Sequence, residues 1–309
     1  MTTNVLRSAL IALSQNRQLR SFAEQSPMGQ KMSGRFIAGM RVADALRVAE
    51  TLNREGIPVS LDSLGENVST EEEARRAADI YHQLLDAIQK RGLQANVSAK
   101  LTQMGMNISP AIARQITSEL VDHAAAADSF LRVDMEGSDL TQATIDLTRE
   151  IHGMPGHAGH IGAVLQSYLH RCEDDVNLLL AERIRIRLCK GAYKEPTTVA
   201  FPNKADVDAN YLKLTKILLT SGVYHGLATH DEAIIRETKK FVEREGIDKR
   251  SFEFQMLYGV RRDLQTSLAK EGYGMRVYVP FGTDWYPYFM RRLAERPANV
   301  LFIAKNLFK

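Results

Sequence analysis

Polar side chains of several chemical kinds stand at the ends of short apolar segments along this chain. They are Asp62, Lys100, Asp134, Gln166, Arg187, His230, Gln255 and Tyr278. Carboxylates, cations, an imidazole and a phenol can together orient a charged substrate, move protons and stabilise charge that develops during a reaction. These residues are candidates for one catalytic site if the fold brings the segment ends together.

The stretch Arg185–Tyr193 (Arg-Ile-Arg-Leu-Cys-Lys-Gly-Ala-Tyr) carries the strongest signal. Its first four residues alternate between charged and apolar, as in a strand. Lys190, Gly191 and Ala192 then form a small-residue loop that a planar ligand can approach closely. A strand arginine such as Arg187 can simply face solvent. In a sheet covered on both faces, however, the buried charge of Arg187 needs an oppositely charged or hydrogen-bonding partner. This requirement favours a functional role for Arg187.

Lys100 and Asp134 end two successive segments, so a sheet would place them side by side. Opposite charges at that distance hold each other ionised. The pair could take part in a reaction, or it could only close the sheet with an ion pair. The sequence does not separate these two roles.

A helical stretch, Trp285–Glu295, follows the last segment. At about 100° per residue, Tyr288, Arg291, Arg292 and Glu295 fall on one arc of about 100°, opposite the apolar residues. Such an arc can be a solvated face. Two adjacent arginines can equally bind a carboxylate or a phosphate while the tyrosine covers an apolar ring. The pattern alone does not decide between these interpretations.

The histidines give little support for a metal site. His152, His157 and His160 lie close in sequence, but they precede an apolar segment rather than follow it. Paired-histidine spacings of the HxH or HExxH type are absent, and so are the glycine-rich nucleotide fingerprints. We therefore expect no bound metal, and His230 is the one well-placed histidine.

Segments rich in Val, Ile and Leu alternate with stretches of helical periodicity, which is the pattern of a (β/α)8 barrel. The expected strands are Ile57–Leu61, Ala95–Ala99, Phe130–Val133, Ile161–Leu165, Arg185–Leu188, His225–Ala228, Phe252–Phe254 and Met275–Val279. The active site of such a barrel lies at the carboxyl ends of its strands. The sequence thus predicts an α/β fold, a distorted TIM-like barrel over residues 57–309 with an N-terminal helical extension over residues 1–56.

Composition is that of a globular domain. Of 309 residues, 44% are hydrophobic and 25% are charged, and the net charge of +3 comes from interleaved charges, so nucleic-acid binding is not indicated. An apolar run of about 18 residues, which would predict a membrane span, does not occur. Only Cys172 and Cys189 are present, which suits a cytoplasmic setting. Contact of the basic N-terminal region with the inner face of a membrane stays open.

Taken in order, the segments resemble the proline dehydrogenase family. The matching pieces are Val97–Lys100, Arg132–Gly137, Val164–Gln166, Arg187–Tyr193, Ala228–Asp231, Glu253–Gly259, Arg276–Thr283 and Tyr288–Arg292. Each motif is weak by itself, but the ordered set is specific, and the length resembles the monofunctional bacterial form. Cys189 departs from the family, which often has an aliphatic residue there, and we expect it to be a small packing residue.

The resemblance implies that FAD lies over the strand ends and that L-proline is oxidised to 1-pyrroline-5-carboxylate. Hydride would pass to flavin N5 and electrons to a membrane quinone, and a separate pyrroline-5-carboxylate dehydrogenase would take the product. The implied catalytic residues are Asp134 and Arg187, and the implied substrate contacts are Lys100, Tyr278, Tyr288, Arg291 and Arg292. The implied cofactor contacts are Met135, Gln166, Lys190, Gly191, Ala192, Thr229 and His230, with Lys204, Gln255 and Glu295 as further candidates.

Two other functions fit the same residues. A Schiff-base lyase or aldolase on this barrel would use Lys100 or Lys190 as an amine nucleophile. A non-enzymatic barrel would bind carboxylates through Arg291 and Arg292 without any electron transfer. Neither alternative predicts a flavin, so a flavin spectrum that bleaches with L-proline separates both from the redox enzyme.

Overall fold

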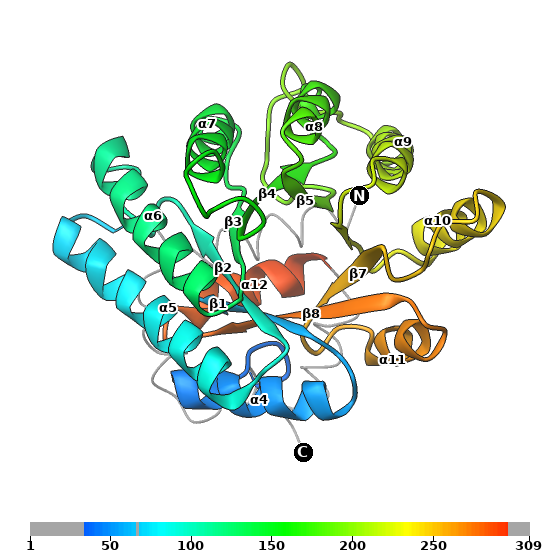
Figure 1. Cartoon of the computed structure of the whole chain (residues 1–309). Coiled ribbons are helices and arrows are strands. Elements are labelled where there is room, and N and C mark those ends of the chain that lie inside the picture. The colour runs from blue at the N-terminus through cyan, green and yellow to red at the C-terminus, as the bar shows by residue number, and fades with distance from the viewer. Residues whose placement is uncertain (1–33, 66–67, 296–309) are drawn as a thin grey trace.

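Eight parallel strands pair in sequence order and close into a barrel (Figure 1). A computed structural model of the chain describes residues 34–65 and 68–295, with side chains described as far as residue 290. The strands are β1 (Val59–Ser63), β2 (Ala95–Lys100), β3 (Leu131–Asp134), β4 (Ile161–Gln166), β5 (Arg185–Cys189), β6 (His225–Ala228), β7 (Phe252–Leu257) and β8 (Gly274–Phe281). Strand β1 also pairs with β8, which closes the ring. The predicted (β/α)8 barrel is confirmed.

A helix follows each strand, and one further helix precedes β1. The helices are α4 (Val42–Arg54), α5 (Glu71–Arg91), α6 (Pro110–Ala126), α7 (Thr141–His152), α8 (Cys172–Ala181), α9 (Lys204–Thr220), α10 (Glu232–Arg244), α11 (Arg262–Lys270) and α12 (Trp285–Glu295). Side-chain caps set where several of them begin. Thr70 Oγ1 accepts from Glu73 N at the start of α5, and Asp231 Oδ1 accepts from Ala233 N at the start of α10.

The hydrophobic core forms a layer between the strands and the surrounding helices. Val59 and Leu61 on β1, and Ile186 and Leu188 on β5, have no solvent exposure and belong to this layer. Because side chains alternate along a strand, the residues between them point to the barrel axis. This alternation is what carries polar residues inward while the outward positions remain apolar.

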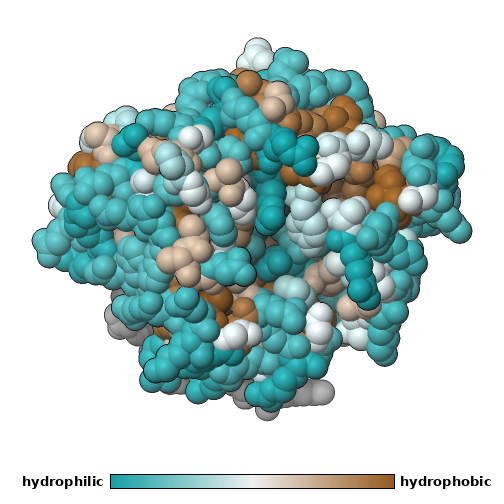
Figure 2. All heavy atoms as spheres, viewed as in Figure 1, coloured by the Kyte–Doolittle hydropathy of each residue, from teal (hydrophilic) through white to brown (hydrophobic). Residues whose placement is uncertain are grey.

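The interior of the barrel is largely polar. Arg187 on β5 donates hydrogen bonds to Ser60 on β1, Ser98 on β2 and Gln255 on β7, so these side chains meet at the barrel axis. Barrel interiors are usually filled by branched apolar residues. Here Arg187, Ser60, Ser98 and Gln255 satisfy one another with hydrogen bonds, which offsets the cost of removing them from water. In the space-filling view, hydrophilic residues reach the centre of the face shown (Figure 2).

Helix α4 completes the barrel wall. Its buried residues Ala45, Leu46, Ala49 and Leu52 belong to the main core, and the helix packs against β8, β1 and α5. Helix α12 instead lies across one mouth of the barrel, inside the ring of helices (Figure 1). It forms a separate apolar cluster whose members are Phe36, Ile37, Leu64, Trp285, Tyr286, Tyr288, Phe289 and Met290. The domain boundary at residue 56 remains a proposal. Helix α4 lies within residues 1–56, yet its buried residues belong to the core of the barrel.

None of the helices within the described ranges is both long enough and apolar enough to cross a membrane.

Candidate active site

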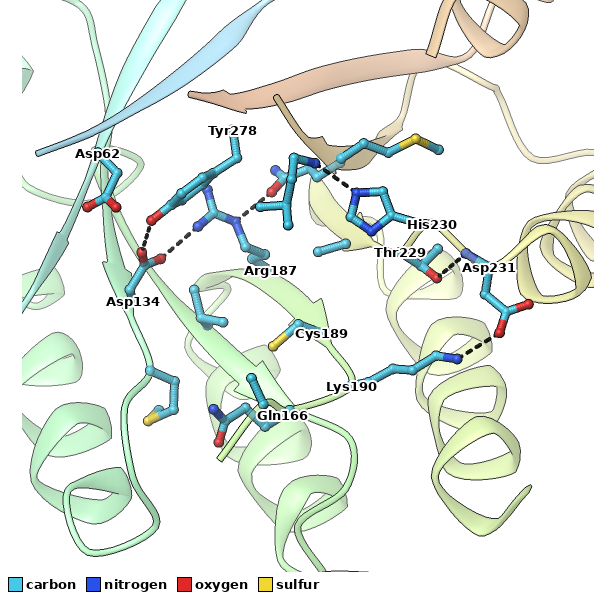
Figure 3. A pocket seen from close by; sticks show the side chains of 18 of the residues that line it. Asp62, Asp134, Gln166, Arg187, Cys189, Lys190, Thr229, His230, Asp231 and Tyr278 are labelled. Atoms are coloured by element: carbon cyan, nitrogen blue, oxygen red, sulfur yellow. Dashed lines mark hydrogen bonds and ion pairs between the residues drawn. The ribbon is translucent and has the colours of Figure 1, made fainter. Parts of the chain in front are cut away.

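A cavity of about 740 Å³ opens at the carboxyl ends of the strands. Fourteen of the candidate residues named from the sequence line it: Asp62, Lys100, Asp134, Met135, Gln166, Arg187, Lys190, Gly191, Ala192, Thr229, His230, Gln255, Tyr278 and Tyr288. Figure 3 shows Asp134, Arg187 and Tyr278 converging on one side of this cavity, while Lys190, Thr229 and His230 approach from the other. The side chains of Arg291 and Arg292, on α12, lie outside the part of the chain that the structure describes.

Asp134 is the centre of the charged side of the cavity. Its carboxylate accepts hydrogen bonds from Ser98 Oγ, Arg187 Nη1 and Tyr278 Oη, each at 2.7 Å. The side chains of Arg187 and Asp134 are only 6% and 13% exposed, so this ion pair is largely shielded from solvent. Removal from water and the neighbouring Asp134 carboxylate raise the pKa of Tyr278 well above its usual value. Tyr278 therefore stays a neutral hydrogen-bond donor.

Lys100 pairs with a different carboxylate from the one expected. The strand register does place Lys100 beside Asp134. However, the Lys100 ammonium lies 3.3 Å from Asp62 Oδ1 on β1, and Asp134 forms its ion pair with Arg187. The expected Lys100–Asp134 pair is thus wrong, because Arg187 reaches across the barrel axis to the Asp134 carboxylate. Burial raises the pKa of Asp62, and the positive charge of Lys100 opposes that rise.

Arg187 has little freedom to move. Its Nε donates to Gln255 Oε1 at 2.5 Å, its Nη1 donates to Ser98 and Asp134, and its Nη2 donates to Ser60 Oγ at 3.3 Å. A guanidinium has five N–H donors, so these four bonds leave one Nη2 donor for a ligand. The group also lies 5.2 Å from the centre of the Tyr278 ring, within cation–π range.

The loop after β5 forms the other side of the cavity. Gly191 has φ of +110°, and a Cβ atom there would overlap the ring of Tyr168. Glycine is therefore required for this backbone path. The neighbouring Lys190 ammonium lies 2.5 Å from Asp208 Oδ1 and 2.9 Å from Asp231 Oδ2. Burial opposes ionisation of Asp231, but its hydrogen bond and ion pair with Lys190 lower its pKa to about 2.

Two further side chains in the cavity have fixed orientations. His230 Nε2 accepts the backbone N–H of Leu257 at 2.9 Å, so the proton of a neutral ring lies on Nδ1. Gln166 Nε2 donates to the Glu136 carbonyl at 3.4 Å, whereas Gln166 Oε1 is buried with no hydrogen-bond partner among the described residues. Such an orphaned acceptor in a cavity wall is suited to a ligand that brings an N–H group.

Cys189 also lines the cavity. Removal from solvent raises the pKa of its thiol to about 12, so the reactive thiolate does not form near neutral pH. Sequence reasoning missed other residues of the site, above all Asp208 and the ion-pairing role of Asp231. Asp231 ends the matched Thr-His-Asp motif and could have been noticed. Asp208 follows Lys204 by four residues on α9, and this spacing indicates only a surface ion pair.

The comparisons with known proteins agree with this geometry. A family model described as "Proline dehydrogenase" matches residues 45–305. The chain belongs to the proline dehydrogenase family. It is 40% identical to Proline dehydrogenase 1 of Bacillus subtilis subsp. natto over 306 residues, which cover 99% of this chain and all of the relative. It is also 40% identical to the Proline dehydrogenase of Deinococcus radiodurans over 316 residues, which cover both chains completely.

A solved structure supports the fold. Proline utilization A from Bdellovibrio bacteriovorus, inactivated by N-propargylglycine, matches with a TM-score of 0.82 at 24% identity. The match covers 95% of this chain but only 37% of that longer protein. Membership of the proline dehydrogenase family confirms the prediction of an oxidoreductase of proline catabolism on a TIM-like barrel.

Proposed function

We propose that the chain uses FAD to oxidise L-proline to 1-pyrroline-5-carboxylate. The observation that carries this proposal is the cavity at the strand ends, in which a cluster of charged and aromatic residues faces a small-residue loop. The charged side suits a zwitterionic amino acid, and the loop side suits a planar cofactor. Family membership makes proline the natural substrate for such a cavity.

Three features of the cavity fit a flavin. The orphaned Gln166 oxygen suits the imide N–H of an isoalloxazine ring. Gly191 lets the chain approach a flat group closely, and the Lys190 ammonium, which Asp208 and Asp231 hold in place, would donate to the cofactor. Met135, Ala192, Thr229 and His230 would complete the cofactor contacts. When bound, FAD would supply at N5 the acceptor for hydride from the ring carbon beside the proline nitrogen.

The residues of the chain would position and stabilise the reacting groups. Arg187 carries a fixed positive charge in a site with little solvent, where it would stabilise negative charge that develops on the cofactor. Asp134 holds Arg187 and Tyr278 in place through two hydrogen bonds. Neither residue needs to act as a nucleophile, because the cofactor carries the redox chemistry.

The substrate would bind beneath α12. Tyr278 and Tyr288 line the cavity and would cover the apolar ring of proline. Arg291 and Arg292 follow Tyr288 by three and four residues along α12, and we propose that they clamp the substrate carboxylate. Lys100 would assist them from β2. A double cationic clamp orients the substrate without joining the reaction, because the carboxylate is not a reacting group.

The Schiff-base alternative is less well supported. It needs an uncharged lysine amine, whereas Lys100 pairs with Asp62 and Lys190 pairs with Asp208 and Asp231. An amine held in an ion pair is not presented to a carbonyl as a nucleophile.

The absorbance spectrum of the purified protein tests the proposal. We expect flavin bands that bleach when L-proline is added without oxygen and recover when a quinone is added. A colourless protein, or bands that L-proline leaves unchanged, would refute the proposed reaction. We also propose that the enzyme is cytoplasmic and that its electrons pass to a membrane quinone; recovery with a soluble quinone would support a quinone as acceptor. A separate pyrroline-5-carboxylate dehydrogenase would then consume the product.

Substitution tests the clamp. Arg291→Met or Arg292→Met removes a charge-assisted contact, so proline binding should weaken by about 1.5–3 kcal/mol, or roughly tenfold to over a hundredfold, while flavin content stays constant. Arg236→Met is the matched control, because Arg236 is exposed on α10 with its side chain 62% accessible. If the clamp variants bind proline as tightly as the control, the assignment is wrong.

A further inference from the structure

Gln255 connects Arg187 to a carboxylate deeper in the barrel. Gln255 Oε1 accepts from Arg187 Nε at 2.5 Å, and Gln255 Nε2 donates to Glu253 Oε1 at 2.6 Å. Both Glu253 and Gln255 are only 4% exposed. They are alternate residues of β7, so both point to the barrel axis. Gln255 lines the cavity, whereas Glu253 lies below it.

The charges at the two ends fix the direction of the Gln255 amide. A guanidinium offers only donors, so the amide oxygen must face Arg187. An ionised carboxylate offers only acceptors, so the amide nitrogen must face Glu253. Burial alone would raise the pKa of Glu253, but Arg276 Nε, at 2.7 Å, and the other hydrogen bonds outweigh burial and lower it. Glu253 is therefore ionised, and the amide has one stable orientation.

The surrounding residues are shaped to hold this arrangement. A Cβ atom on Gly226, the neighbour of Glu253 on β6, would overlap the Gln255 amide. Tyr224 donates to the second oxygen of Glu253 at 3.0 Å, so both carboxylate oxygens have donors. Arg276 is held in turn by the Val59 carbonyl at 2.8 Å. The barrel therefore has both the space and the partners that the Glu253–Gln255 contact requires.

We propose that Glu253 and Gln255 are positioning residues for Arg187, an inference that rests on the proposed function. Gln255 anchors the Nε edge of the guanidinium, while Asp134 anchors Nη1. Two anchors on different edges fix the plane of the group and the direction of its remaining Nη2 donor. Glu253 acts at a distance, because it keeps the Gln255 oxygen turned toward Arg187. A fixed cation matters most in the transition state, since small misplacements there slow a reaction strongly.

The test replaces Gln255 by methionine, which has a similar length but no amide. We expect kcat with proline and a dye acceptor to fall by about ten- to a hundredfold, while KM for proline changes less than about threefold. The midpoint potential of the bound flavin, measured without proline, should become more negative because the nearby cation is less well placed. Tyr224→Phe is the control, since it also removes one hydrogen bond to Glu253 but leaves the Gln255–Arg187 contact intact.

A second variant covers the case in which Gln255→Met does not fold. The double variant Glu253→Met with Arg276→Met removes the buried ion pair as a unit, which proteins often tolerate, and leaves Gln255 without its acceptor. It should show the same fall in kcat and the same shift in potential. A folded Gln255→Met with wild-type kcat and potential would overturn the inference, as would an equal loss in Tyr224→Phe. Lost flavin content that accounts for the whole effect would also overturn it. A wild-type protein that does not oxidise proline would instead refute the proposed function.

Discussion

Replacing Tyr278 by phenylalanine removes one of the three donors to Asp134 and leaves the ring in place. A hydrogen bond to a charged group contributes about 1.5–3 kcal/mol to stability, whereas a neutral one contributes about 0.5–1.5 kcal/mol. The bond from Tyr278 to Asp134 measures 2.7 Å and lies beside a shielded ion pair, so we place it in the higher range. The free energy of unfolding should therefore fall by about 2 kcal/mol.

Tyr211 provides a matched control within the same barrel. Its hydroxyl donates to the Leu188 carbonyl at 3.2 Å, and the side chain is fully buried. Tyr211→Phe makes the same chemical change against an uncharged acceptor, so the expected loss is about 1 kcal/mol. The assay is urea unfolding at one fixed flavin concentration, because a ligand that binds the folded state changes the apparent stability.

A double-mutant cycle with Asp134→Asn separates charge from packing. In the Asp134→Asn background, Tyr278→Phe should cost only as much as a neutral hydrogen bond, which gives a coupling energy of about 1 kcal/mol. Tyr211→Phe should show no coupling to Asp134. Two results would contradict a charge-assisted hydrogen bond between Tyr278 and Asp134. One is a loss of unfolding free energy in Tyr278→Phe no larger than that in Tyr211→Phe. The other is strict additivity of the losses in Tyr278→Phe and Asp134→Asn.

Two further predictions concern pH and the cofactor loop. Burial, followed by the charge of Arg132, lowers the pKa of His225 to about 3. Between pH 3 and its usual pKa of about 6.5, the unfolded state therefore binds one more proton at this residue than the folded state does. The free energy of unfolding should thus fall by about 1.4 kcal/mol per pH unit as pH decreases from 6.5, and His225→Gln should remove this part of the slope in urea titrations. Gly191→Ala should lower flavin content measured by absorbance, because its Cβ would overlap Tyr168; undiminished content would show that the loop adapts.

The sequence predicted many of the residues that gather at the cavity. Strand alternation and strand order are local properties, and together they place Lys100, Asp134 and Gln166 at neighbouring strand ends. The partner of each charge depends on the direction and reach of the side chain, which strand order does not encode. Lys100 pairs with Asp62 on the neighbouring strand β1, and Arg187 on β5 reaches the carboxylate that the sequence assigned to Lys100.

Helix positions were harder to predict than strands. Periodicity shows that a helix forms and which face is apolar, but not which groove that face fills. The apolar residues of α4 could have packed on any strand pair, and they fill the groove beside β8 and β1. Likewise, Asp208 forms an ion pair with Lys190 because α9 packs beside β5, the strand that precedes Lys190. Such contacts depend on tertiary packing rather than on local pattern.

The position of α4 has a consequence for how the protein opens. Helix α4 packs on the outer face of β8 and β1. Helix α12 can therefore detach from the mouth of the barrel without exposing the outer face of these strands. Its apolar cluster is also distinct from the main core. The barrel and α12 should therefore behave as separate cooperative units in hydrogen exchange, with amides of α12 exchanging well before those of the strands. Access to the cavity would then require only local detachment of α12, while the barrel itself stays folded.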